Sequence, residues 1–156
     1  MMILLSLVLS LFAGTAVAGT DQAVKDVEQT LDHFHQAAAK ADGAAYFALF
    51  APDGVFLGTD ASERWTVDEF KKYALARFAK GHGWTYVPKE RHVTVAPSGD
   101  VAWFDELLVN EHLGTCRGSG VLRRLGGAWR ISQYNLSIPV PNGLADKVVG
   151  MIRQTP

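Results

Sequence analysis

The residues best suited to acid–base chemistry lie in strand-like segments of the C-terminal half. Arg91, Glu106 and Arg117 supply one carboxylate and two guanidinium groups. If tight turns join these segments, Arg91 faces Glu106 and Glu106 faces Arg117 across neighbouring strands. Arg117 then faces Leu136, close to Tyr134. Such a trio in an apolar cavity either binds and polarises an anionic or carbonyl-bearing ligand, or forms an ion-pair network that only joins three strands.

A second pair suited to acid–base chemistry is His92 opposite Asp105, on the other side of the same expected sheet. A carboxylate beside an imidazole can orient the ring as a general base. The alternative is a His–Asp pair at an interface between two copies of the chain. Gln133 and Asn135 are expected on this side and could hydrogen-bond a substrate.

Two further residues are candidates because of their position next to expected elements. His35 lies four residues after Leu31 on an expected helix, so it either reaches into the cavity or is a hydrogen-bonded core histidine. Trp65 follows the polar loop 58–64 and either covers the mouth of a pocket or packs on the next helix. The candidates are, for catalysis, Glu106, Arg117 and His35, with His92 and Asp105 as the second choice, and, for ligand binding, Arg91, Tyr134 and Trp65.

The sequence contains no recognisable metal or cofactor motif. His33 and His35 are two residues apart on a helix and therefore cannot both reach one metal ion. No HxxxH, CxxC, GxGxxG or GxSxG pattern occurs. The single cysteine, Cys116, excludes an internal disulfide and is either a buried small apolar residue or a nucleophile. We expect neither metal nor cofactor.

Length and composition indicate one folded domain. The chain has 156 residues, of which 48% are hydrophobic and 20% charged, enough for a packed core and too apolar for a disordered chain. Lys and Arg total 15 against 16 Asp and Glu, and no basic run is present. This balance argues against a nucleic-acid-binding protein.

The first eighteen residues have the features of an export signal. Met1–Ala18 contains no charged side chain and ends in the small–x–small triplet Ala16-Val17-Ala18. We therefore expect a signal peptide over 1–18 and a periplasmic or secreted domain over 19–156, with no stable membrane insertion after cleavage. The alternative is a retained anchor, because no Lys or Arg follows Met1. Against an anchor, the segment is shorter than the about 20 apolar residues that a spanning helix needs.

Helical spacing dominates the first half of the remaining chain. Apolar residues three and four positions apart predict a helix over Asp21–Ala41, and a shorter helix is expected over Ala44–Phe50. Thr66 and Glu69 form the pattern of a capping box at the start of a third helix. A short strand over Val55–Leu57 is expected between the second and third helices.

From Trp84 onward the period changes to two, which predicts an antiparallel meander with helices on one face and hence an α+β fold. A two-residue turn at Glu111-His112, with Asn110 opposite Leu113, would place Cys116 and Gly118 on the side away from Glu106. A C-terminal helix is expected over 144–152. The four expected strands are Trp84–Ala96, Val101–Asn110, Leu113–Leu125 and Ala128–Ile138.

Several local sequences resemble the SnoaL-like branch of the nuclear transport factor 2-like proteins. They are Phe56–Asp60 followed by Glu63–Trp65, Asp100–Phe104, Arg117–Arg124 leading into Gly127–Ile131, and Asn135–Ser137. The resemblance covers residue 23 to about residue 139. It implies the cone-shaped, cystatin-like fold, in which a curved antiparallel sheet wraps over N-terminal helices and encloses a pocket. It also implies frequent homodimers through the outer sheet face.

The functions implied by this resemblance are diverse. Such folds include isomerases, dehydratases, cyclases and non-catalytic association domains, and the fold alone does not decide among them. We expect an exported domain that binds a small amphipathic organic ligand, with cofactor-free acid–base catalysis of the isomerase, dehydratase or hydrolase type as a further step. The alternative is a non-catalytic binding or assembly module that acts as a homodimer. A histidine common in the last strand of relatives is Asn135 here.

Overall fold

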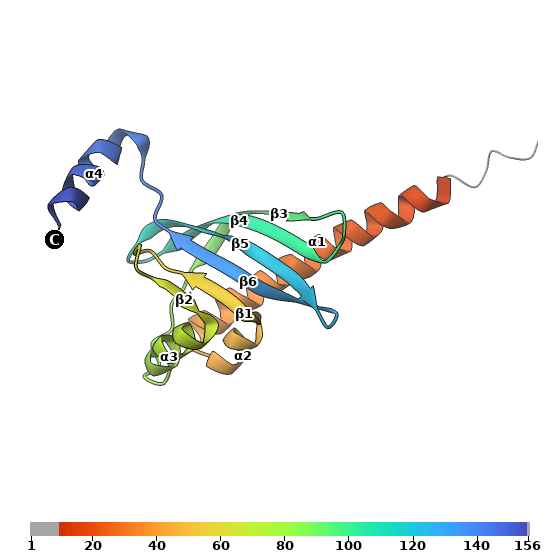
Figure 1. Cartoon of the computed structure of the whole chain (residues 1–156), viewed down its shortest axis with the longest axis horizontal. Coiled ribbons are helices and arrows are strands. Elements are labelled where there is room, and N and C mark those ends of the chain that lie inside the picture. The colour runs from red at the N-terminus through yellow and green to blue at the C-terminus, as the bar shows by residue number, and fades with distance from the viewer. Residues whose placement is uncertain (1–9, 156) are drawn as a thin grey trace, which may run out of the picture.

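The computed structural model describes residues 10–155, with side chains from residue 19 onward. The first helix, α1, spans Ser10–Ala39 and lies across one face of a curved sheet (Figure 1). Its expected start at Asp21 is wrong, since the preceding Ala- and Leu-containing segment has no proline to end the helix. The leader predicted over 1–18 lies outside the residues whose side chains are described, so the signal peptide stays a prediction.

Two short helices and two strands follow α1. Helix α2, Gly43–Ala48, begins at Asp42, whose carboxylate accepts a hydrogen bond from the Ala45 backbone N–H at 3.0 Å. The helix expected up to Phe50 ends earlier because the chain enters strand β1, which runs from Phe50 to Leu57. Strand β2, Arg64–Thr66, was not expected and pairs antiparallel with β1.

Helix α3, Val67–Phe78, begins at the predicted capping box. The Thr66 hydroxyl accepts a bond from the Glu69 N–H at 3.4 Å, and the Thr66 N–H donates to Glu69 Oε2 at 2.9 Å. Two N-terminal backbone donors of this region are satisfied in this way. The capping box therefore determines where the β2 strand, which carries Trp65, turns into α3.

The expected meander is confirmed by strands β3 (Val87–Val95), β4 (Val101–Asn110), β5 (Gly114–Leu125) and β6 (Ala128–Ser137). The sheet has the order β2-β1-β6-β5-β4-β3 and is open. Strand β1 runs parallel to β6, so the sheet is mixed and not wholly antiparallel. Helices α1 and α3 pack on its concave face, as expected for an α+β cone (Figure 1).

The register between β4 and β5 differs by one residue from the expected one. Asn110 pairs with Gly114, so the connection spans three residues, with Gly114 at φ +70°. A shift of one residue moves every side chain of β5 to the opposite face. Glu106 consequently pairs with Gly118, and Arg117 lies opposite Leu107 on the outer face.

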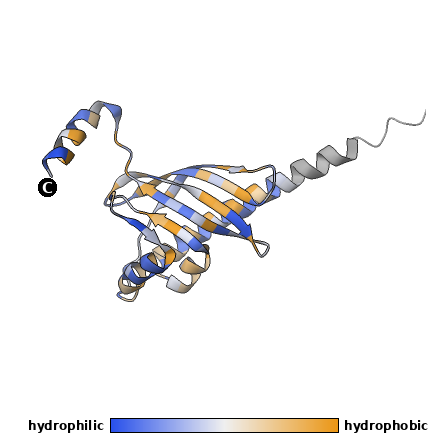
Figure 2. Cartoon of the chain, viewed as in Figure 1, coloured by the Kyte–Doolittle hydropathy of each residue, from blue (hydrophilic) through white to orange (hydrophobic). Residues whose placement is uncertain are grey.

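The core lies between α1, α3 and the inner face of the sheet. Apolar positions alternate with polar ones along the strands (Figure 2). Cys116 is fully buried on this inner face, and burial raises the pKa of its thiol, which confirms the small apolar role and corrects its expected outer placement. The sheet residues buried here include Phe56, Ala102, Phe104, Leu108, Cys116, Leu122, Ile131, Tyr134 and Leu136.

The chain ends in a helix that leaves the domain. A 3₁₀ turn, Asn142–Leu144, leads into α4, Ala145–Gln154, which has no buried residue. Figure 1 shows α4 projecting away from the end of β6. Within residues 10–155, none of the helices combines the length and the apolar character needed to cross a membrane.

Candidate functional site

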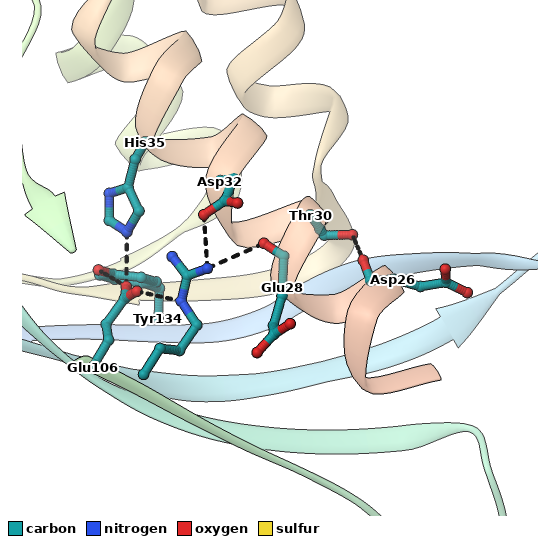
Figure 3. Close-up of polar contacts among 8 residues, drawn as sticks. Asp26, Glu28, Thr30, Asp32, His35, Glu106 and Tyr134 are labelled. Atoms are coloured by element: carbon teal, nitrogen blue, oxygen red, sulfur yellow. Dashed lines mark hydrogen bonds and ion pairs between the residues drawn. The ribbon is translucent and has the colours of Figure 1, made fainter. Parts of the chain in front are cut away.

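A buried carboxylate, that of Glu106, is the centre of the polar residues inside the core. Glu106 is 1% exposed. Its Oε1 atom lies 2.8 Å from His35 Nε2 and accepts a hydrogen bond from the Tyr134 hydroxyl at 3.0 Å. Its Oε2 atom accepts a bond from Arg91 Nε at 2.8 Å. Each carboxylate oxygen is therefore hydrogen-bonded, as a buried charge requires (Figure 3).

Four elements bring these groups together. Glu106 points inward from β4 and Arg91 from the paired position of β3, which confirms the expected Arg91–Glu106 register. Tyr134 comes from β6, and His35 comes from α1 above the sheet. The helix and three strands are thus joined at one carboxylate.

Arg91 connects the carboxylate to the surface of α1. Its Nη1 atom donates to Asp32 Oδ1 at 2.7 Å and to the Glu28 carbonyl at 3.2 Å. The Arg91 side chain is 10% exposed, whereas that of Asp32 is 52% exposed. Among the described residues, the buried Nη2 atom of Arg91 has no hydrogen-bond partner.

The electrostatics keep Glu106 ionised and Tyr134 protonated. Burial by itself raises the pKa of Glu106, but the hydrogen bonds and charges of His35 and Arg91 outweigh it and hold the pKa below its ordinary value. Burial and, after it, the neighbouring Glu106 charge raise the pKa of Tyr134 well above its ordinary value. The site therefore combines a carboxylate with a phenolic proton donor at neutral pH. We call His35, Glu106, Tyr134 and Arg91 the buried polar cluster.

Four candidate residues lie outside this cluster, and three of them are exposed on strands of the sheet. Arg117 is exposed on the outer face, so the expected Glu106–Arg117 pairing is wrong, for the register reason given above. His92 and Asp105 are paired across β3 and β4 as expected. The His92 imidazole, however, contacts Glu90 Oε1 at 2.8 Å, with both side chains more than half exposed. Among the side chains that the structure describes, the His92 imidazole therefore pairs with Glu90 and not with the Asp105 carboxylate, so the expected dyad is not formed.

A pocket opens between the β1–β2 connection, α3 and the end of the sheet. Its volume is about 250 Å³. Trp65 lines it and also stacks on the α3 side chains Phe70 and Tyr73, with ring centroids 5.6 and 5.3 Å apart. Both interpretations of Trp65, pocket wall and packing on the helix, therefore hold together. Other lining residues are Phe56, Glu63, Arg77, Trp84, Tyr86 and Leu136.

The pocket and the buried polar cluster are neighbours with a shared wall. Phe56 lines the pocket and stacks on Tyr134, with the ring centroids 5.7 Å apart and the planes 6° apart. No member of the cluster is itself a lining residue of this pocket. In the part of the chain that the structure describes, no three potential metal-binding side chains come together.

Sequence reasoning missed two residues that shape the cluster. Asp32 forms a second ion pair with Arg91. Asp32 lies three residues before His35, and this spacing predicts that the two side chains share one face of the helix. Gly118 was placed on the wrong face. A Cβ atom there would lie 2.4 Å from the Tyr134 hydroxyl and 2.8 Å from Glu106 Oε1, so only glycine leaves room for this contact.

Comparisons with known proteins agree with this architecture. The SnoaL-like domain family matches residues 27–141. Among curated proteins, a search finds no match. A similar solved structure is a nuclear transport factor 2-like protein of unknown function from Pseudomonas putida, with 18% identity and a TM-score of 0.66. The similarity covers 78% of this chain and 90% of that one.

Two other similar structures carry provisional enzyme assignments. A provisionally assigned dehydratase of the same superfamily from Streptomyces avermitilis has 16% identity and a TM-score of 0.65, covering 78% of this chain and 99% of that one. A provisionally assigned scytalone dehydratase from Novosphingobium aromaticivorans has 12% identity and a TM-score of 0.67, covering 80% and 89%. Identities this low show the fold alone. These structures show a nuclear transport factor 2-like fold, and the family match over most of the sequence establishes that the chain belongs to the SnoaL-like domain family.

Proposed function

We propose that the protein binds a small amphipathic organic molecule in the pocket beside Trp65. The observation that carries this proposal is the set of nearly parallel rings at the pocket. Phe56 and Phe70 stack with centroids 4.0 Å apart, and the Trp65 ring lies within 15° of both planes. Phe56 and Phe70 are buried, and the half-buried Trp65 ring stacked on them offers a flat aromatic surface that favours a ligand with a planar apolar part.

The rim of the pocket supplies polar contacts for the other end of such a ligand. Arg77 and Glu63 provide opposite charges, and Tyr86 provides a hydroxyl. Burial raises the pKa of Tyr86 to about 12, so this hydroxyl is a hydrogen-bond donor at neutral pH. A volume of about 250 Å³ is at the small end for ligand sites, which favours a compact molecule over a lipid.

The binding proposal is tested with 1-anilinonaphthalene-8-sulfonate, a compact aromatic anion, and with native mass spectrometry of the purified protein. Trp65→Ala should weaken binding of this probe by about tenfold or more, equivalent to about 1.4 kcal/mol. Trp103→Ala is the matched control, since Trp103 is 48% exposed on the outer face. Equal weakening by both substitutions would contradict the proposal. Arg77→Met, which leaves the aromatic walls intact, guards against an effect of Trp65→Ala on folding.

The buried polar cluster supports a second candidate function, cofactor-free acid–base catalysis of the isomerase, dehydratase or hydrolase type. An ionised Glu106 between His35 and Tyr134 provides groups that can accept and donate protons. The provisional dehydratase assignments of two similar folds favour the same class. Because Phe56 separates the cluster from the pocket, we propose ligand binding as the first function and catalysis as the second. Catalysis predicts that His35→Asn abolishes turnover while binding of the probe is kept.

The proposed assembly is a homodimer through the outer sheet face, and the proposed location is the periplasm or the exterior. Trp103, which is 48% exposed, offers an apolar contact on that face. If neither ligand nor turnover is found, a non-catalytic assembly module is the alternative. The native mass spectrum gives the subunit count, and the mass of the protein recovered from the cell envelope shows whether residues 1–18 are removed.

A further inference from the structure

The apolar face of the C-terminal helix is unpartnered in the fold. Ala145, Val148, Val149 and Ile152 are three and four residues apart and therefore share one side of α4. Val149 and Ile152 are 43% and 65% exposed, and within the described residues α4 packs mainly on the turn that precedes it. Figure 2 shows the apolar and polar residues of α4 side by side on a helix that stands clear of the sheet. An exposed apolar helix face of this kind is expected to pack against another apolar surface.

A second unpartnered apolar surface lies at the open end of the cone. Trp84, Tyr86, Val87, Val109 and Leu113 line a groove of about 630 Å³, which we call the mouth groove. Val87, Val109 and Leu113 are 44%, 41% and 40% exposed. Trp84, Tyr86 and Leu113 also line the pocket beside Trp65. Anything seated in the mouth groove would therefore cover one side of that pocket.

The apolar face of α4 and the mouth groove lie at the same end of the sheet, counted along the strands. Strand β6 ends at Ser137 beside the start of β5, while β4 ends and β3 begins at the same edge. Residues 138–141 span about 13 Å when extended and the 3₁₀ turn adds about 6 Å, so the connection between β6 and α4 reaches about 19 Å. Three strand spacings, from β6 to β3, amount to about 14 Å. A ten-residue helix is about 15 Å long, so α4 matches this width.

Charges at the borders of the two surfaces are also compatible. Arg153 and Asp146 lie next to each other along one border of the apolar face of α4, whereas Lys147 lies on the opposite, polar side of the helix. The mouth groove carries Glu111 and Arg77. Opposite charges are thus available on both surfaces, and they would orient the helix more than they would add affinity.

We propose that α4 docks its apolar face in the mouth groove of its own chain and closes the pocket beside Trp65. The docking depends on the exposed apolar residues of the two surfaces and on the linker. Its consequence, slower exchange of a bound molecule, rests on the proposed ligand-binding function. Docking and ligand retention are therefore measured separately.

Docking is tested by disulfide trapping in the full chain without a ligand. Val87→Cys is combined with Ile152→Cys on the apolar face of α4, or with Gln154→Cys on its polar face as the control. Cys116 is fully buried and stays out of the reaction. We expect the first pair to form an intrachain disulfide about tenfold faster than the control. Equal rates would overturn the proposal, and a disulfide-linked dimer would overturn it in favour of a second copy as the occupant.

Ligand retention is tested with the anilinonaphthalene sulfonate probe. Ile152→Asp should raise the dissociation rate of the probe by about tenfold, since a buried charge opposes docking. Gln154→Asp adds the same charge to the polar face and should leave the rate unchanged. Unchanged dissociation in both variants would overturn the closing role of α4. Absence of probe binding in the wild-type chain would instead contradict the proposed function, and the disulfide rates would still report on docking.

Discussion

Gly118 of β5 lies directly opposite Glu106 of β4, and the missing side chain at position 118 is the space in which the Glu106 carboxylate meets the Tyr134 hydroxyl. The buried polar cluster fits in the apolar core because position 118 of the neighbouring strand has no side chain. A glycine in the middle of a strand usually weakens it. Here the same residue permits the hydrogen bonds of a buried charge.

Replacing Gly118 by alanine should destabilise the fold. The new methyl group would lie 2.4 Å from the Tyr134 hydroxyl and 2.8 Å from Glu106 Oε1, so the Tyr134–Glu106 hydrogen bond must break or the strands must move. We expect a loss of about 1–3 kcal/mol in the free energy of unfolding, measured by urea denaturation. Ser119→Ala, on the other face of the same strand, is the control and should stay within about 0.5 kcal/mol of the wild type. A Gly118→Ala variant as stable as this control would show that the contact contributes little.

Arg91 and Arg117 should respond very differently to replacement by methionine. Arg91→Met leaves the buried Glu106 carboxylate without its guanidinium partner, at an expected cost of about 3 kcal/mol. Arg117→Met removes an exposed charge from the outer face and should change the free energy of unfolding by less than about 0.5 kcal/mol. Thermal and urea unfolding of both variants measure the difference. Equal costs would contradict the observed register of β5.

The stability of the protein should fall in acid partly because of Glu106. The folded state holds the pKa of Glu106 below the ordinary value of 4.5. The unfolded chain therefore takes up the proton first, and the contribution of Glu106 to stability is full above this value and is lost as the pH falls through the folded-state pKa. The difference in unfolding free energy between the wild type and Glu106→Gln should be constant near neutral pH and shrink below pH 4.5. A difference that does not vary with pH would show that the folded and unfolded pKa values are equal.

The capping box of α3 should matter for the pocket as well as for stability. Thr66→Ala removes the side-chain partner of the Glu69 N–H and should cost about 1 kcal/mol. Because Trp65 directly precedes this cap and stacks on α3, the same substitution should also weaken binding of the anilinonaphthalene sulfonate probe. Thr59→Ala, in the preceding loop, serves as the control for stability. Loss of stability with unchanged probe binding would show that the cap does not determine the position of the Trp65 side chain.

Local rules were enough for much of the architecture. The capping box at Thr66, the apolar stripe of α1 and the four-strand meander follow from spacing and capping, which act over a few residues. The turn between β3 and β4 was placed correctly, and therefore Arg91 opposite Glu106 was correct as well. The assignment to a SnoaL-like cone, confirmed by the family match, rests on the same ordered elements.

The face to which each β5 side chain points was decided in three dimensions. The residues Glu111-His112-Leu113-Gly114 allow a two-residue or a three-residue connection, and the left-handed conformation of Gly114 belongs to the longer one. With this one extra residue in the connection, Arg117 lies on the outer face, and Gly118 and Cys116 lie on the inner face. Packing selects the register because only it buries Cys116 and keeps the Arg117 guanidinium in water.

The sequence is sufficient to predict the helices, the four-strand meander and their order, although not strand β2, and to place Arg91 opposite Glu106 in adjacent strands. The contacts of His35 and Tyr134 with Glu106 join residues far apart along the chain and become visible with the three-dimensional packing. The same holds for the position of the aromatic pocket, which lies beside this cluster and not around it. The difference lies in how far apart along the chain the interacting residues are. Periodicity, capping and tight turns are local, whereas the partner of a buried charge is chosen by the packing of a helix against a curved sheet.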